Sequence, residues 1–115
     1  MIRDDLVYLA HIIDALRQIT IYTSRMGQES FLENRLVQDG VIRQFEIVGE
    51  ATKNISTPFR DRYPFIPWRD LAGFRDKLIH QYFGVDLATV WRSVVEDVPM
   101  LQDELLNIQT SENQD

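Results

Sequence analysis

An arginine, a histidine and a tyrosine lie close together in residues 74–86, a segment that otherwise has the pattern of a buried helix. Arg75, His80 and Tyr82 follow the spacing arginine-x4-histidine-x-tyrosine, and Asp76 follows the arginine directly. An imidazole titrates near neutral pH and can take the proton from a ribose 2′-hydroxyl. A guanidinium can stabilise the negative charge that builds up around phosphorus in the transition state. These residues are therefore candidates for RNA cleavage without a metal ion.

The helical spacing of these residues decides which side chains can act together. At about 100° per residue, Arg75 and Tyr82 project in nearly the same direction, whereas Arg75 and His80 are about 140° apart. One helix cannot easily direct both groups at one phosphorus atom, but two copies of the helix around a two-fold axis can. Such a pair also supplies two histidines, one as base and one as acid. Asp76 lies one turn before His80 and would orient its imidazole, or would pair with a neighbouring lysine or arginine.

Each of these residues also has a purely structural interpretation. The chain contains ten arginines and two histidines, so an arginine followed five residues later by a histidine often arises by chance. A tyrosine on an apolar helix, such as Tyr82, is more often a core aromatic residue whose hydroxyl finds a partner than a functional group. The second histidine, His11, is interpreted as a structural residue within an apolar stripe on the first helix. The bare pattern therefore does not establish a catalytic site.

Glu46 and Glu50 lie one turn apart on a second predicted helix. Their spacing of three from Arg43 and Lys53 suits ordinary pairs on a helix surface. Alternatively, both carboxylates reach the next helix and hold Arg75 within a polar patch. Two carboxylates without a histidine or a third ligand do not predict a metal site, so we expect no bound metal.

Apolar residues recur every three or four positions along most of the chain, and no stretch shows the strict alternation of a half-buried strand. Four helical segments with short connections predict an all-α fold, an up-and-down four-helix-type bundle. Residues 1–107 are expected to form one helical domain and residues 108–115 a flexible tail. One stripe on the first helix consists of Ile2, Leu6, Leu9, Ile13, Leu16 and Thr20.

Glycine, proline and capping residues predict where the helices begin and end. The first helix should stop before Gly27, the second at Pro58 and the third at Gly84. The predicted helices are residues 2–26, 30–57, 67–83 and 87–107, with a loop at residues 57–67, a possible break at Asp39-Gly40, an N-cap at Asp86 and a kink near Pro99.

The charge of the chain restricts how it could bind RNA. A net charge of −6 weighs against indiscriminate binding to nucleic acid, because phosphate affinity comes largely from clustered lysine and arginine. An RNA substrate would have to meet a local basic patch, or the basic residues are simply a solvated face. The clustered basic residues are Arg60, Arg62, Arg69, Arg75 and Lys77.

Composition also bears on the cellular compartment. The chain has no cysteine, which excludes disulfides and thiolate metal sites and fits a reducing cytosol. Residues 1–5 are charged where a signal peptide would be apolar, and no run approaches the eighteen apolar residues of a membrane span. We therefore expect a cytoplasmic protein with no membrane association.

Several stretches together make the chain resemble the HepT-like toxins of the HEPN superfamily. They span roughly half of the chain in the expected order. The matching stretches are residues 43–51 (RQFEIVGEA), residues 66–69 (IPWR), the motif of Arg75, His80 and Tyr82, residues 85–87 (VDL) and residues 90–91 (VW).

This resemblance implies a homodimer with its active cleft at the subunit interface. It implies metal-independent endoribonuclease activity, with tRNA as the RNA substrate, that depends on Arg75 and His80, with Asp76 as the polar residue of the motif. It also implies a type II-like toxin–antitoxin system, in which an MntA-type nucleotidyltransferase antitoxin uses ATP to attach AMP to Tyr82. AMP at Tyr82 would fill the cleft and compete with RNA phosphate for Arg75. The chain itself would need no cofactor.

Two other interpretations retain the helical bundle but assign the protein no catalytic activity. A non-catalytic HEPN module would bind a nucleotidyltransferase partner or a nucleotide without cutting RNA. A dimerising scaffold would need His80 for stability alone. Burial of Arg75 and His80 within their own bundle would favour the non-catalytic module.

Overall fold

A computed structural model describes the backbone of residues 2–80 and 86–114, and the side chains of residues 4–74 and 86–114. The described residues are mostly helical and contain no strand, which confirms the predicted all-α fold. The elements are α1 (Ile2–Thr23), α2 (Gln28–Leu32), α3 (Arg35–Lys53), α4 (Thr57–Arg62), α5 (Trp68–His80), α6 (Leu87–Arg92), a π-helical turn (Ser93–Asp97) and α7 (Val98–Glu112).

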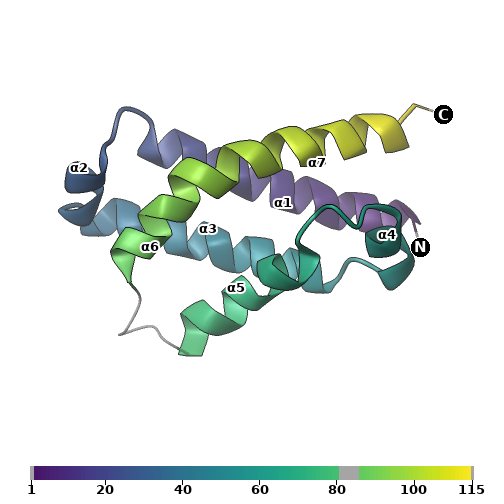
Figure 1. Cartoon of the computed structure of the whole chain (residues 1–115), viewed down its shortest axis with the longest axis horizontal. Helices are drawn as coiled ribbons and strands as arrows, with labels where there is room; N and C mark the ends of the chain where they lie inside the picture. The colour runs from purple at the N-terminus through teal and green to yellow at the C-terminus, as the bar shows by residue number, and fades with distance from the viewer. Residues whose placement is uncertain (1, 81–85, 115) are drawn as a thin grey trace.

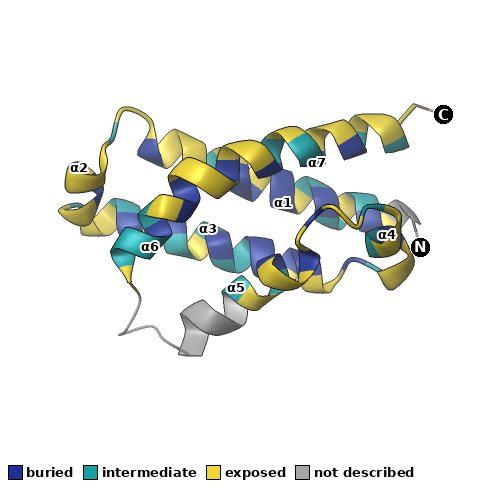
Figure 2. Cartoon of the chain, in the orientation of Figure 1, coloured by how far each residue is buried: buried dark blue, intermediate teal, exposed yellow. Residues whose placement is uncertain are grey.

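The long helices alternate in direction, as expected for an up-and-down bundle (Figure 1). Helix α3 packs against both α1 and α5, and α7 packs against α1. The buried faces of α1, α3 and α7 turn toward one another, while their outer faces are exposed (Figure 2). Helix α5 covers a second side of α3, so α3 is the element that positions α5.

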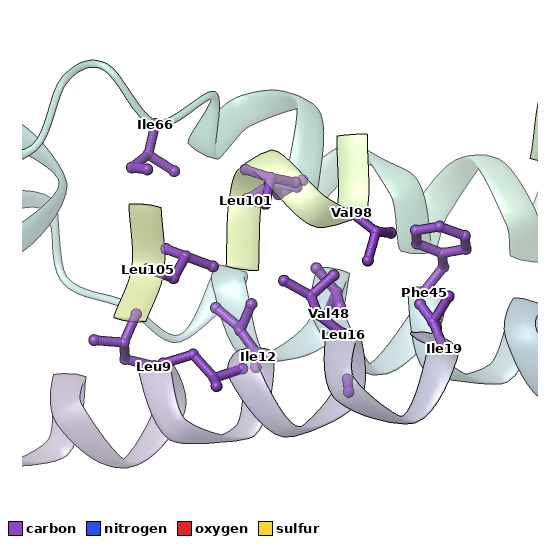
Figure 3. Packing of buried hydrophobic residues seen from close by; sticks show 14 of the residues in the cluster. Leu9, Ile12, Leu16, Ile19, Phe45, Val48, Ile66, Val98, Leu101 and Leu105 are labelled. Atoms are coloured by element: carbon purple, nitrogen blue, oxygen red, sulfur yellow. The ribbon is translucent and has the colours of Figure 1, made fainter. Parts of the chain in front are cut away.

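The core consists of aliphatic and aromatic side chains from every long helix. Leu9, Ile12, Leu16 and Ile19 of α1 point toward residues of α3 and α7 (Figure 3). Their spacing of three and four places them on one face of α1, which explains why the apolar pattern predicts this helix. The side chains with almost no exposure are Leu9, Ile12, Leu16, Ile19, Phe31, Val41, Val48, Phe59, Val98 and Leu105.

The predicted break at Asp39-Gly40 is wrong, because α3 continues through Gly40. A Cβ atom at Gly40 would lie 3.2 Å from two ring carbons of Tyr22, so the glycine allows close packing against α1. The real break comes earlier, at Asn34. The Asn34 Oδ1 atom accepts a hydrogen bond of 3.0 Å from the Val37 backbone N–H and starts α3 as its N-cap.

Helix α1 is shorter than predicted, because it ends at Thr23 and not near Met26. Arg25 has a φ of 68°, the left-handed conformation that commonly terminates a helix. Gly27, predicted as the terminator, instead precedes α2 as its N-cap. The chain therefore reverses direction two residues before the glycine.

The expected loop at residues 57–67 contains a short helix, α4, and this part of the prediction is wrong. Pro58 lies in the first turn of α4, where a missing N–H costs nothing, and does not end the preceding helix. Helix α3 has already ended at Lys53. The Ser56 Oγ atom accepts a hydrogen bond of 3.3 Å from the Phe59 N–H and caps α4.

Asp86 is the N-cap of α6, as predicted. Its carboxylate accepts hydrogen bonds from the Ala88 N–H (3.0 Å) and the Thr89 hydroxyl (2.8 Å). The hydrogen bond from Thr89 is the main reason that the pKa of Asp86 lies below its ordinary value. The predicted end of the preceding helix at Phe83 and Gly84 lies outside the described residues.

The irregularity expected near Pro99 is present as the π-helical turn Ser93–Asp97, immediately before it. Pro99 has no N–H to donate to the carbonyl of Val95, and its ring would clash with that carbonyl in a regular α-helix. A locally widened turn relieves this conflict and lets α6 and α7 form one nearly continuous rod.

A flexible tail was expected at residues 108–115, but residues 108–112 belong to α7, which continues to Glu112. Ile108 is buried. The Glu112 carboxylate accepts a hydrogen bond from the Tyr63 hydroxyl and forms an ion pair of 2.8 Å with Arg62. Burial, followed by the nearby Glu112 carboxylate, raises the pKa of the Tyr63 hydroxyl. The helical domain therefore extends beyond residue 107.

The other end of the chain is fastened to the start of α4 by Asp5. The Asp5 carboxylate accepts hydrogen bonds of 2.7 Å from both the N–H and the hydroxyl of Ser56, and only 2% of the residue is exposed. Replacing Asp5 by alanine leaves both donors without their partner. We expect the free energy of unfolding to fall by about 2–3 kcal/mol.

Urea denaturation measures this effect, and Asp4→Ala is the matched control because Asp4 is exposed on the same turn of α1. Equal losses of stability in the two variants would contradict a specific contribution from the Asp5–Ser56 hydrogen bonds.

Candidate functional site

Helix α5 carries the backbone of Arg75, Asp76 and His80, which places the three predicted catalytic residues on one helix. Their side chains lie outside the described residues, and so does all of Tyr82. The part of α5 that precedes the motif, residues 68–74, is described with its side chains.

Three aromatic or aliphatic residues fix the first half of α5 to the bundle. Trp68 is buried, and its indole N–H donates a hydrogen bond of 2.9 Å to the carbonyl of Tyr63. Leu71, one turn later, is also buried. The ring of Phe74 stacks on that of Phe45 in α3, with centroids 4.7 Å apart and planes 7° apart. The residue that immediately precedes Arg75 is thus firmly packed against α3.

Glu46 and Glu50 lie on the outer side of α3. A nitrogen of Arg43 lies 4.0 Å from an oxygen of Glu46, so the predicted surface pair is present. At this distance, and with the Arg43 side chain 68% exposed, the pair adds little stability. The alternative contact of these carboxylates with Arg75 falls outside the described side chains. Within residues 4–74 and 86–114, no three histidine, aspartate or glutamate side chains are grouped closely enough to bind a metal ion.

The outer face of α3 and the neighbouring face of α1 enclose a hollow of about 370 Å³. His11 and Tyr8 line it from α1, with their rings edge to face and their centroids 6.1 Å apart. His11 is exposed, so its interpretation as part of the apolar stripe is wrong. The signal was present in the sequence, since His11 and Leu9, a member of that stripe, project about 160° apart.

Two of the basic residues expected to form an RNA-binding patch are used within the fold. Arg60 donates a hydrogen bond of 2.6 Å to the carbonyl of Thr52 in the last turn of α3. Arg62 pairs with Glu112. Arg69 is exposed, whereas the side chains of Arg75 and Lys77 lie outside the described part. The described contacts thus give Arg60 and Arg62 structural roles.

The described helices include none that is both long enough and apolar enough to cross a membrane. The protein therefore has no membrane-spanning helix within the part of the chain that the structure describes.

Comparison with known proteins identifies relatives along nearly the whole chain. A family described as "Ribonuclease HepT-like" matches residues 12–108. The "Probable ribonuclease HepT" of Thermococcus cleftensis is 47% identical over 95 residues, which cover 83% of this chain and 86% of that protein. A Methanocaldococcus jannaschii protein described as a "Putative RNase" is 42% identical over 106 residues, covering 92% of this chain and 88% of its own.

A second protein of Methanocaldococcus jannaschii is longer. It is described as a "Gamma-glutamylcyclotransferase and putative RNase" and is 44% identical over 108 residues. Those residues cover 94% of this chain but 49% of that protein, so the chain spans about half the length of this relative. No solved structure matches the chain significantly.

Proposed function

Because the chain belongs to the family of HepT-like ribonucleases, we propose that it is an endoribonuclease that cleaves RNA without a metal ion, with Arg75 and His80 as its catalytic residues. The family match carries this proposal, since residues 12–108 include the complete motif of Arg75, His80 and Tyr82. Two of the relatives covered over most of their length are themselves described as ribonucleases.

The proposed reaction is an internal transfer of the phosphodiester. The imidazole of His80 takes the proton from the ribose 2′-hydroxyl, and the 2′-oxygen attacks phosphorus. The bond from phosphorus to the 5′-oxygen breaks, and a protonated imidazole gives that oxygen a proton. The products are a 2′,3′-cyclic phosphate and a free 5′-hydroxyl. The guanidinium of Arg75 stabilises the charge on the non-bridging oxygens, and Asp76 orients His80.

Two copies of the chain form the proposed active cleft. Arg75 and His80 project about 140° apart on α5, so a cleft at a two-fold axis can gather groups from both subunits. The packing of Trp68, Leu71 and Phe74 supports this arrangement, because it anchors the first half of α5 to its own bundle and makes the helix a firm base for the motif. A homodimer also supplies the second imidazole that the reaction needs.

The proposed cellular setting is a type II-like toxin–antitoxin system in the cytoplasm, with tRNA as the RNA substrate. An MntA-type nucleotidyltransferase would use ATP to attach AMP to the hydroxyl of Tyr82, releasing pyrophosphate. Tyr82 and Arg75 are seven residues apart, close to two helical turns, so a helix that continues through Tyr82 would direct both to one side. A bulky anion at Tyr82 would then occupy the place of the RNA phosphate beside Arg75 and stop cleavage.

A cleavage assay on purified protein tests the metal-free mechanism and the shared cleft together. We expect wild-type protein to cut RNA at an unchanged rate in excess EDTA, because no step of the proposed reaction uses a metal ion. We also expect the activity per chain to fall when the protein is diluted below the dissociation constant of its dimer, measured by light scattering. RNA with a 2′-deoxy substitution at the cut site is the matched control, and it should stay intact.

The metal-free reaction and the shared cleft can be contradicted independently of each other. Loss of cleavage in EDTA that returns with added magnesium would overturn the metal-free reaction. Activity per chain that stays constant down to monomer concentrations would overturn the shared cleft.

A further inference from the structure

Helix α5 has an exposed side that begins before the proposed catalytic motif. Arg69 and Gly73 are both exposed, whereas Trp68 and Leu71 are buried on the other side of the helix. Arg69 and Gly73 are four residues apart, which is about 40° around the helix, so they form one stripe. Neither residue belongs to the hydrophobic core of the bundle.

Helical register continues this stripe into the motif. At about 100° per residue, positions 69, 73, 76 and 80 lie within about 60° of one another around the helix. The backbone of α5 is helical over this whole range, to His80. Position 80 lies about 16 Å beyond position 69 along the helix axis. A ligand that lies along this side of α5 and reaches position 80 can therefore also contact Arg69.

Arg69 carries a positive charge that has no partner among the described side chains. The residues three and four positions later are Ala72 and Gly73, so the helix supplies no carboxylate one turn away. Asp70 projects about 100° away from Arg69 around the helix. Within residues 4–74 and 86–114, no ion pair includes Arg69. An exposed guanidinium of this kind suits a phosphate, which it can bind with two parallel hydrogen bonds.

A hydrogen-bonded turn fixes the backbone that carries Arg69. The carbonyl of Tyr63 accepts hydrogen bonds from the Ile66 N–H (3.2 Å) and from the Trp68 indole (2.9 Å). Ile66 and Trp68 are both buried. The start of α5 is thus ordered by the fold itself, so a ligand that binds Arg69 has to order only the side chain.

Gly73 lies inside α5, where glycine is less favourable than any residue except proline. Its φ is not positive, and a Cβ atom at this position would have no heavy atom within 4 Å. Neither the backbone conformation nor the packing of the described chain therefore requires a glycine here. A glycine in such a place allows another molecule to approach the helix backbone closely.

The charge of the stripe favours RNA over a second copy of the chain as that molecule. A contact between two copies would take the guanidinium of Arg69 out of water, and the stripe has no apolar side chain at positions 69 and 73 to offset this cost. An RNA strand brings a phosphate to the same guanidinium. Its sugar–phosphate backbone can then pass over Gly73.

We propose that the stripe of Arg69 and Gly73 binds the RNA strand beside the cleavage site, with Arg69 on a phosphate and Gly73 leaving room for the strand against α5. The proposal rests on the proposed function, because the strand would be the substrate. Since about 16 Å of helix separates positions 69 and 80, the bound phosphate is a few nucleotides away from the cleaved one. The stripe would therefore favour longer single-stranded RNA whatever its bases.

Substrate length tests the contact at Arg69. For an oligonucleotide of about ten nucleotides, Arg69→Gln should raise KM by about tenfold and leave kcat within about twofold of wild type, because the contact binds substrate and transition state equally. For a dinucleotide, which cannot reach from the motif to Arg69, both proteins should have the same KM. An unchanged KM for the oligonucleotide, or an equal loss with the dinucleotide, would overturn the proposal.

Arg35→Gln is the matched control, because it removes the same charge from an exposed site at the start of α3. It should leave the KM for the oligonucleotide unchanged. Arg69→Gln should also reduce the slope of log affinity against log salt by about 0.7, the value for one phosphate contact of a single strand, whereas Arg35→Gln should not. Equal effects of the two variants would contradict a specific contact at Arg69.

Variants of Gly73 test the approach of the strand to α5. Gly73→Ala and Gly73→Gln should melt at the same temperature as wild type or higher, because the space is open and both residues favour a helix. RNA with a 2′-deoxy substitution at the cut site should bind several-fold more weakly to Gly73→Gln than to Gly73→Ala, measured by fluorescence anisotropy. Equal binding would contradict the proposal. Dissociation of the dimer by Gly73→Gln, measured by light scattering, would make this face a contact between copies and would also overturn it.

The outcomes also separate this proposal from the proposed function. Cleavage that neither Arg69→Gln nor Gly73→Gln changes would leave the ribonuclease intact and remove the RNA-binding stripe. Binding of the 2′-deoxy RNA that depends on Arg69, in a protein that leaves unmodified RNA whole, would keep the stripe and remove the ribonuclease.

Discussion

Replacing His80 by alanine is expected to lower the rate of RNA cleavage by about 10²- to 10⁴-fold, the range typical of a positioned general acid or base. The loss should be large because the proposed homodimer would lose both of its proposed catalytic imidazoles at once. Expression without an antitoxin, with growth and the cell's small RNAs followed over time, measures the effect in cells. Wild type should arrest growth and shorten RNA, whereas folded His80→Ala should do neither.

Tyr82→Phe is the matched control for this experiment, because it removes a hydroxyl and leaves the ring. It should remain as toxic as wild type. Added MntA-type nucleotidyltransferase should rescue cells that express wild type and fail to rescue those that express Tyr82→Phe. Full cleavage by His80→Ala would contradict its catalytic role, and harmless expression of wild type with intact RNA would contradict the ribonuclease altogether.

Replacing Leu105 by alanine is expected to lower the free energy of unfolding by about 2–5 kcal/mol. Leu105 is completely buried in the core, on the face of α7 that packs against α1 (Figure 3). The smaller side chain removes apolar contacts and leaves a cavity that the surrounding helices can only partly fill. In a domain of this size, such a loss is a large share of the total stability.

Leu106→Ala is the control, because the same side chain is 40% exposed one residue later. It should cost less than about 1 kcal/mol. Guanidinium denaturation of the two variants gives the comparison, with the slope of the transition checked for a change in the denatured state. Similar losses in both variants would contradict the orientation of α7 described above.

The long helices were predictable because their apolar spacing repeats over many turns. The stripe that includes Leu9 and Leu16 and the cap at Asp86 are features of single helices, and a single sequence contains them in full. Helix α4 was missed, and α2 was not separated from α3, because each is shorter than two turns and too short to show a period. The burial of Glu112 against Arg62 joins residues far apart in the chain, and no local pattern reports it.

The same distinction applies to the candidate site, where features within one segment were predictable and features that join separate helices were not. The motif of Arg75 and His80 can be read from the sequence because its members share one segment. Their angle of about 140° on the helix suggests the proposed meeting across a two-fold axis, but the sequence of one chain contains no contact between two chains. The hollow was missed because Tyr8 and Arg43 come from different helices and meet only after α1 packs on α3. The angle of His11 on the helix predicts that its side chain is exposed. Its apolar neighbours in the sequence instead suggested that it is buried.

Both ends of the described chain are tied to the same short region around α4. Asp5 of α1 binds Ser56 at its start, and Glu112 of α7 binds Arg62 and Tyr63 at its end. Neither terminal helix can therefore fray far without disturbing α4, and loosening α4 releases both. The α4 amides should consequently exchange their hydrogens only when the whole bundle unfolds. This six-residue segment would then hold both terminal helices in place.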